Sequence, residues 1–120
     1  MRDFRKIKAW QLADELTLQL YTITKRFPKE ELFALTSQLR RAAYSVPSNI
    51  AEGAGRRTVK DFLRFLDIAK GSINEVQYFV HLASRLHYLT KDDASSLTVA
   101  ADEVAKCLSG YMKAIESDLK

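Results

Sequence analysis

The residue types that most often perform catalysis or bind metals are few in this sequence and lie far apart. His81 and His87 are six residues apart, which places them on different faces of a helix. Cys107 is the single cysteine, and its only basic neighbour is Lys106, so we interpret it as a small buried hydrophobic residue. The sequence therefore predicts no metal site, no cofactor and no catalytic group, and we expect that the protein is not an enzyme.

Two patterns resemble known sites but lack the residues that define them. Di-iron helical bundles carry Glu-x-x-His motifs, whereas Glu75 is followed three residues later by Tyr78. The glycine-rich stretch at 53–57 is preceded by no strand and followed by no Gly-Lys-Ser/Thr, so it is not a phosphate-binding loop. We interpret this stretch as the end of a helix and a turn, and we expect no small-molecule substrate.

The positive functional signal is a cluster of basic residues. Residues 36–60 carry five basic side chains and one acidic one: Arg40, Arg41, Arg56, Arg57 and Lys60, with Glu52. Arginine presents a planar fork that matches phosphate and can stack on bases, so the cluster predicts a nucleic-acid-binding surface. The alternative is that Arg56 pairs with Glu52 and that the other cations are solvated or hold subunits together.

Apolar residues recur at helical spacing along most of the chain, and no stretch alternates with the period of a strand. Thr58 and Thr90 stand where the N-caps of two helices are expected. The pattern predicts an all-α fold, an antiparallel up-and-down four-helix bundle in a single domain over residues 1–120. The expected helices cover about 9–27, 29–54, 59–88 and 91–117.

The second of these helices contains Pro47. The apolar stripe passes through this residue without losing phase, which favours a helix that is kinked but continuous. Polar neighbours such as Ser45, Ser48 and Asn49 are able to satisfy the backbone groups that a proline frees. A helix that breaks before Pro47 and restarts there is the alternative.

Three residues of the first helix lie off its apolar stripe. Leu18 points almost opposite the stripe, and Trp10 and Tyr21 lie on its flank. Aromatic residues are enriched in the cores of protein interfaces, so these three are candidates for an oligomer interface. They are equally consistent with isolated exposed apolar residues, which are common on soluble proteins.

Composition points to a soluble protein of a reducing compartment. Hydrophobic residues make up 47% and charged residues 28% of the sequence, with a net charge of +4. A single cysteine excludes an internal disulfide, and no apolar run approaches the roughly 18 residues of a membrane span. We expect a cytoplasmic protein without a membrane partner.

The stretch SQLRRAAYSVPSNIAEGAGR, residues 37–56, resembles the hallmark of a known family. It is similar to the four-helix bundle proteins encoded in intervening sequences of bacterial 23S ribosomal RNA genes. The segments FRKIKAWQLADEL and FLRFLDIAKGSINEV extend the resemblance over residues 4 to about 89. The run Pro47–Gly53 is its most specific part.

The resemblance implies an antiparallel four-helix bundle that commonly assembles as a ring-shaped homopentamer. The sequence also looks like the accessory protein of diversity-generating retroelements, which shares the bundle and binds nucleic acid and a reverse transcriptase through a basic surface. Two hypotheses follow. The first is a self-associating bundle that binds structured RNA or a ribonucleoprotein, and the alternative is an oligomeric protein-interaction scaffold that makes no contact with nucleic acid.

Overall fold

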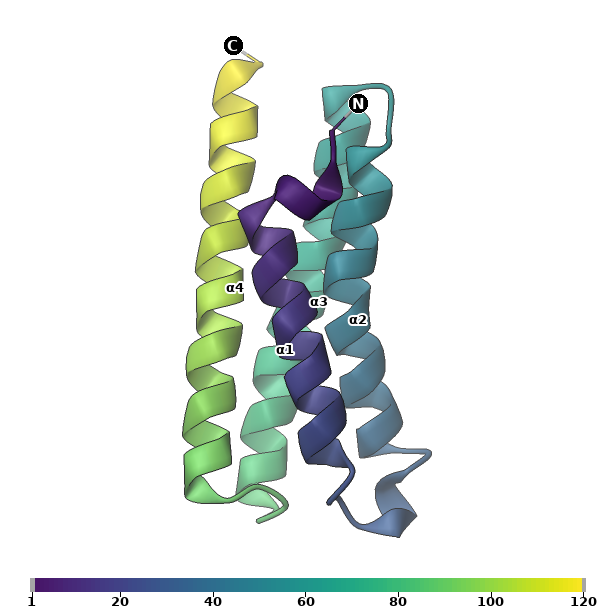
Figure 1. The fold of residues 1–120 in the computed structure, drawn as a ribbon, viewed down its shortest axis with the longest axis vertical. Helices are drawn as coiled ribbons and strands as arrows, with labels where there is room; N and C mark the ends of the chain where they lie inside the picture. The colour runs from purple at the N-terminus through teal and green to yellow at the C-terminus, as the bar shows by residue number, and fades with distance from the viewer. Residues whose placement is uncertain (1, 120) are drawn as a thin grey trace.

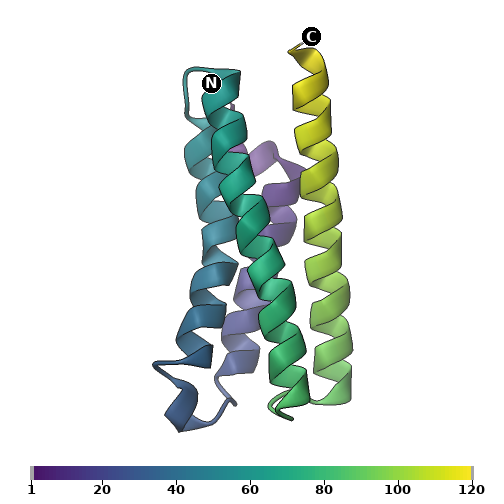
Figure 2. The same cartoon turned by 180° about the vertical axis from the view of Figure 1, so that it is seen from behind.

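The computed structural model describes residues 2–119 as one elongated four-helix bundle, about 47 × 23 × 19 Å (Figure 1). Neighbouring helices run antiparallel, and the view from behind shows α3 in front, between α2 and α4 (Figure 2). The helices are α1 (Lys8–Thr24), α2 (Leu35–Ala54), α3 (Val59–Arg85) and α4 (Lys91–Asp118), with 3₁₀ turns η1 (Phe4–Lys6) and η2 (Lys29–Glu31). The described residues contain no strand, so the predicted fold class is confirmed.

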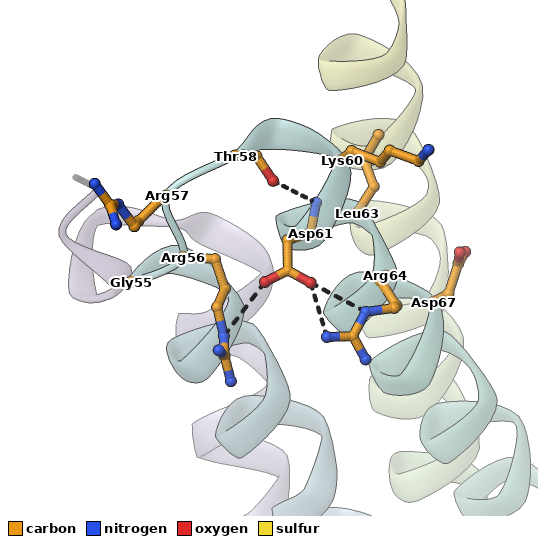
Figure 3. A pocket seen from close by; sticks show the side chains of 9 residues that line it. All are labelled: Gly55, Arg56, Arg57, Thr58, Lys60, Asp61, Leu63, Arg64 and Asp67. Carbon is orange, nitrogen blue, oxygen red and sulfur yellow. Dashed lines mark hydrogen bonds and ion pairs between the residues drawn. The ribbon is translucent and has the colours of Figure 1, made fainter.

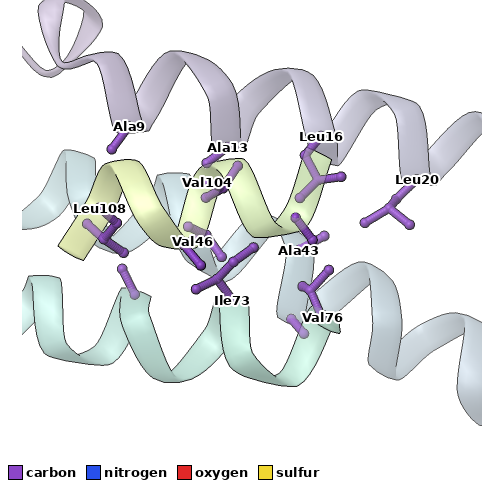
Figure 4. Packing of buried hydrophobic residues seen from close by; sticks show 14 of the residues in the cluster. Ala9, Ala13, Leu16, Leu20, Ala43, Val46, Ile73, Val76, Val104 and Leu108 are labelled. Carbon is purple, nitrogen blue, oxygen red and sulfur yellow. The ribbon is translucent and has the colours of Figure 1, made fainter. Parts of the chain in front are cut away.

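The apolar stripes of the four helices meet along the axis of the bundle (Figure 4). Each helix contributes fully buried side chains, among them Leu20, Leu39, Phe62, Leu66, Ile73 and Leu108. Burying a side chain of this size stabilises the fold by about 1.5–3 kcal/mol, so the stripes are the main source of stability. No helix in the described part of the chain combines the length and the apolar character that a membrane span needs.

Both predicted threonine caps are present. The Thr58 side chain accepts a hydrogen bond from the Asp61 backbone N–H at 3.1 Å, at the start of α3. Thr90 accepts from the Asp93 N–H at 3.1 Å, at the start of α4. Each cap satisfies one of the N–H groups that the first turn of a helix leaves unpaired.

Helix α2 continues through Pro47, as the sequence predicts. Proline has no N–H, so the carbonyl of Ala43, four residues earlier, loses its helical donor. The Thr17 hydroxyl of α1 lies 3.1 Å from this carbonyl oxygen and 2.8 Å from its own helical acceptor, the Ala13 carbonyl. A side chain of the neighbouring helix thus forms a hydrogen bond with the freed carbonyl. Asn49, one of the polar neighbours expected in this role, donates its amide to the Ser45 carbonyl instead.

The predicted start of the second helix, at residue 29, is wrong. Residues Lys29–Glu31 form η2, and α2 begins only at Leu35, after a break at Ala34 with φ −124° and ψ −106°. The Glu31 side chain makes one local and one tertiary hydrogen bond at this break. One carboxylate oxygen accepts from the Leu35 N–H at 3.2 Å, and the other accepts from the Tyr88 hydroxyl at 2.8 Å.

Two other helices end three residues before their expected limits. Helix α1 ends at Thr24, and α3 ends at Arg85, followed by His87 at φ 63°. The loop after α3 then places Tyr88 against Glu31, and this hydrogen bond raises the pKa of the Tyr88 hydroxyl. Tyr88 also packs on the Phe27 ring, with the ring centroids 5.6 Å apart.

Candidate nucleic-acid interface

The turn between α2 and α3 forms an open concavity of about 770 Å³ at one end of the bundle (Figure 3). We call it the turn concavity. Its position follows from sequence, because α2 ends at Ala54–Gly55 and Thr58 starts α3 three residues later. It is lined by four cations, two carboxylates and three uncharged residues: Arg56, Arg57, Lys60, Arg64, Asp61, Asp67, Gly55, Thr58 and Leu63.

Two of the four cations are held in place by neighbouring side chains. Arg56 and Arg64 converge on Asp61, at 3.7 Å and 2.7 Å (Figure 3). Both guanidinium groups also stack on the Phe65 ring, 4.5 Å and 4.8 Å from its centroid. Arg56 further lies 3.6 Å from Glu52, which is the ion pair that the alternative reading of the sequence anticipates.

The other two cations have no ion-pair partner among residues 2–119. Arg57 and Lys60 are exposed and point outward on either side of the Asp61 cluster (Figure 3). An ion pair would have to be broken before an arginine could bind a phosphate, so these two are the cations most available to a polyanion.

Arg40 and Arg41 lie elsewhere. Arg41 lies thirteen residues before the end of α2 at Ala54, which corresponds to about 20 Å along the helix, and Arg56 follows that end. Arg40 faces α1, where its Nε donates to the Thr24 hydroxyl at 2.8 Å and its guanidinium covers the Tyr21 ring at 4.7 Å. The two arginine pairs therefore do not form one continuous surface with Lys60.

Arg41 lines a second, smaller hollow of about 250 Å³ between α2 and α3. Glu75 stands across from it on α3, and hydroxyl groups lie at the seam between the helices. There the Ser72 hydroxyl donates to the Ser45 hydroxyl oxygen at 2.8 Å, which ties the two helices together. Among the described residues Arg41 makes no ion pair, so its charge is also open to a ligand.

The three interface candidates of α1 differ in exposure. Leu18 is 59% exposed and Tyr21 is 37% exposed, although Tyr21 lies beneath Arg40. Trp10 is half-buried and packs edge-to-face on Phe4, with the centroids 4.9 Å apart, so it is largely a structural residue. Tyr44, which is not one of these three candidates, is exposed on α2 one residue after Ala43, where α2 contacts α1.

Leu63 and Arg64 are residues of the turn concavity that the sequence analysis missed. The signal was present, because Arg64 follows Lys60 by four residues and Asp61 by three, so all three share one helix face. The described residues include no group of three or more His, Cys, Asp or Glu side chains placed to hold a metal ion.

Comparison with known families decides the relationship that the motif suggests. The model of the 23S rRNA-intervening sequence protein family matches residues 5–110, which is most of the chain. The chain belongs to this family. The match contains all of α1, α2 and α3 and most of α4, and therefore both arginine pairs and the whole turn concavity.

A solved structure supports the same assignment to the 23S rRNA-intervening sequence proteins. A protein of unknown function from the S23 ribosomal protein family of Bacteroides thetaiotaomicron superposes with a TM-score of 0.81 at 25% sequence identity. The superposition covers 88% of this chain and 95% of that one. No curated protein matches the sequence.

Proposed function

We propose that this protein is a non-enzymatic, self-associating helical bundle of the cytoplasm that binds structured RNA or a ribonucleoprotein through its basic surface. The observation that carries the proposal is the pair Arg57 and Lys60, two exposed cations without ion-pair partners in the described chain, which line the turn concavity together with two further arginines. Membership of a family named for the 23S ribosomal RNA gene is consistent with an RNA ligand.

The five predicted contact residues have unequal roles in this proposal. Arg57 and Lys60 contact phosphates directly, and Arg41 adds a third, separate contact. Arg40 and Arg56 are held by Thr24 and by Asp61 with Glu52, so they contribute positive potential more than direct contacts. Assembly of several copies would multiply such weak contacts through multivalency.

Binding to a 23S ribosomal RNA fragment over a series of salt concentrations tests the proposal. Each phosphate contact contributes about 0.7–0.9 to the slope of log affinity against log salt. We therefore expect Arg57→Gln with Lys60→Gln to lower the slope by about 1.4–1.8. The matched control is Lys25→Gln with Lys91→Gln, which removes the same charge from the opposite end of the bundle and should leave the slope near that of the wild type. Affinity that is independent of salt, or equal effects of the two double variants, would contradict the proposal.

The second candidate is an oligomeric protein-interaction scaffold, and the exposed Leu18 favours it. The family resemblance implies a homopentamer, in which Leu18, Tyr21 and Tyr44 would be covered by a neighbouring copy. The molar mass in solution of the wild type and of Leu18→Glu separates this question from RNA binding. If the protein is such a scaffold, the Leu18→Glu variant should have a lower molar mass in solution than the wild type. The wild type should then show no salt-dependent affinity for RNA.

A further inference from the structure

Phe33 is the most exposed large hydrophobic residue of the described chain. Its side chain is 93% exposed, and the adjacent Leu32 is also exposed. Single exposed apolar residues are common, but an aromatic ring presented almost entirely to water is costly and unusual. We call residues 32–34, which lie between η2 and α2, the Phe33 loop.

The Phe33 loop is anchored at both ends by hydrogen bonds. The Leu32 N–H donates to the Lys29 carbonyl at 3.1 Å, and the Ala34 N–H donates to the Glu31 carbonyl at 3.0 Å. The Glu31 side chain is tied in turn to the Leu35 N–H and to the Tyr88 hydroxyl. The loop is therefore preorganised, so little conformational entropy is lost when a partner binds over Phe33.

Arginine side chains cover several of the other aromatic rings of this protein. Five arginine–ring contacts occur in the described chain, at 4.3–5.3 Å from the centroid, against roughly one or two expected for its length. Phe4, Tyr21, Phe62 and Phe65 are all covered in this way. Among the described residues Phe33 has neither a cation nor another ring over it.

The turn concavity has the chemistry to receive such a ring. Leu63 and the aliphatic stems of its four basic residues supply apolar surface, and the arginines supply guanidinium planes. Its four cations exceed its two carboxylates by two charges. The segment that leads into the Phe33 loop carries Glu30 and Glu31 with Lys29, a net charge of −1, so the two surfaces are complementary in charge.

The two surfaces lie at opposite ends of the molecule (Figure 1). The Phe33 loop precedes α2 and the turn concavity follows it, and the 20 residues of α2 span about 30 Å. No rearrangement within one bundle brings them together. We propose that the Phe33 loop of one copy docks into the turn concavity of a second copy, with the ring against Leu63 and the arginines beside it, and Glu30 facing the rim cations.

This contact is heterologous, because it joins two different patches, and it leaves a free loop and a free concavity at the two ends of each pair. Contacts of this kind extend into open chains unless a rotation closes them. One aromatic anchor buries little surface, so the association is weak and becomes visible only at high protein concentration. The inference does not depend on RNA binding or on an oligomer interface at Leu18 and Tyr21 of α1.

Sedimentation velocity over a wide range of protein concentrations tests the inference with four samples. They are the wild type, Phe33→Ser, the double variant Arg57→Glu with Lys60→Glu, and an equimolar mixture of the two variants. Phe33→Trp is the conservative control, because tryptophan preserves an aromatic anchor. All substituted side chains are exposed and make no hydrogen bond within the described chain, so the helical fold should be retained, which circular dichroism checks.

We expect the mass of the wild type and of Phe33→Trp to keep rising with concentration. Each loss variant alone should associate at least tenfold more weakly. In the mixture, association should return but should produce only dimers. The intact loop of the double variant is able to dock into the intact concavity of Phe33→Ser, and this dimer has no second intact loop or concavity with which to bind another copy. The inference is overturned if Phe33→Ser associates like the wild type, if the wild type shows no rise, or if the mixture regains nothing. Loss of RNA binding alone would affect only the proposed function.

Discussion

Gly53 lies where α2 closely approaches α3, and replacing it by alanine tests the packing of the bundle. A Cβ atom at this position would lie 2.7 Å from the Phe65 Cβ and 3.0 Å from the Phe62 Cδ1. The Phe65 Cβ is bonded directly to the α3 backbone, so this atom moves away only if helix α3 itself shifts. Overpacking of this kind costs about 1–3 kcal/mol. Alanine in a helix interior recovers about 1 kcal/mol relative to glycine, so the net effect is destabilising or close to neutral.

Gly71 and Gly110 are matched controls for the helix-propensity term. A Cβ atom at either position meets no atom within 4 Å. Gly71→Ala and Gly110→Ala should therefore each stabilise the protein by about 0.5–1 kcal/mol. The difference in unfolding free energy between Gly53→Ala and Gly71→Ala then isolates the steric cost, which we expect to be about 1–3 kcal/mol.

Urea denaturation followed by far-ultraviolet circular dichroism measures these differences, at one low protein concentration because self-association adds apparent stability. A difference of 1 kcal/mol should also shift the Tm by roughly 4 °C in a domain of this size. If Gly53→Ala is stabilised as much as Gly71→Ala, the close approach of α2 to α3 does not exist as described. In that case the reasoning about the packing of these helices is refuted.

Two further predictions concern single hydrogen bonds. Thr17→Val removes the donor to the Ala43 carbonyl and should lower the unfolding free energy by about 1–3 kcal/mol, whereas Thr17→Ser keeps the hydroxyl and should cost less in the same urea experiment. The hydrogen bond to Glu31 raises the pKa of Tyr88 in the folded state above the unfolded-state pKa near 10. The stability that this hydrogen bond provides is therefore complete below pH 10 and is lost as the pH rises through the folded-state pKa. Tyr88→Phe should therefore lose less stability than the wild type above pH 10 in thermal melts, and equal losses would contradict the assignment.

The helices and their buried faces are predictable from sequence because a helix repeats its own pattern locally. Leu16, Leu20, Leu39, Ile50 and Leu108 each belong to a run of apolar residues at helical spacing, and all are buried. Each stripe depends only on spacing within its own helix, so no knowledge of neighbours is needed. The same reasoning holds for Pro47, where an unbroken phase predicts a continuous helix.

The start of α2 shows where this local reasoning fails. Leu32 continues the stripe of Leu35 and Leu39 in phase, and Glu30 with Glu31 fits the first turn of a helix. The structure nevertheless breaks at Ala34, because Glu31 binds Tyr88 from a loop 57 residues away. A local pattern carries no information about such a partner, and the exposed Phe33 follows from it.

The candidate interface was likewise predictable from the sequence only in part. Its basic residues are visible in the sequence, but their availability depends on the register between helices. Arg40 is occupied because α1 places Thr24 and Tyr21 beside it, and Arg56 is occupied because the turn returns Asp61 to it. Only the three-dimensional arrangement separates these residues from Arg57 and Lys60.

Arg57 and Lys60 belong to both proposals, and this has a physical consequence. A phosphate backbone and the Phe33 loop of a second copy need the same cations, so they exclude one another at one concavity. RNA at concentrations above its dissociation constant should therefore shorten any end-to-end chains by mass action. Phe33→Ser removes the competitor without touching the concavity, so at high protein concentration its affinity for RNA should equal or exceed that of the wild type. Weaker RNA binding by this variant would mean that Phe33 contacts RNA itself, and the two surfaces would then act together instead of in competition.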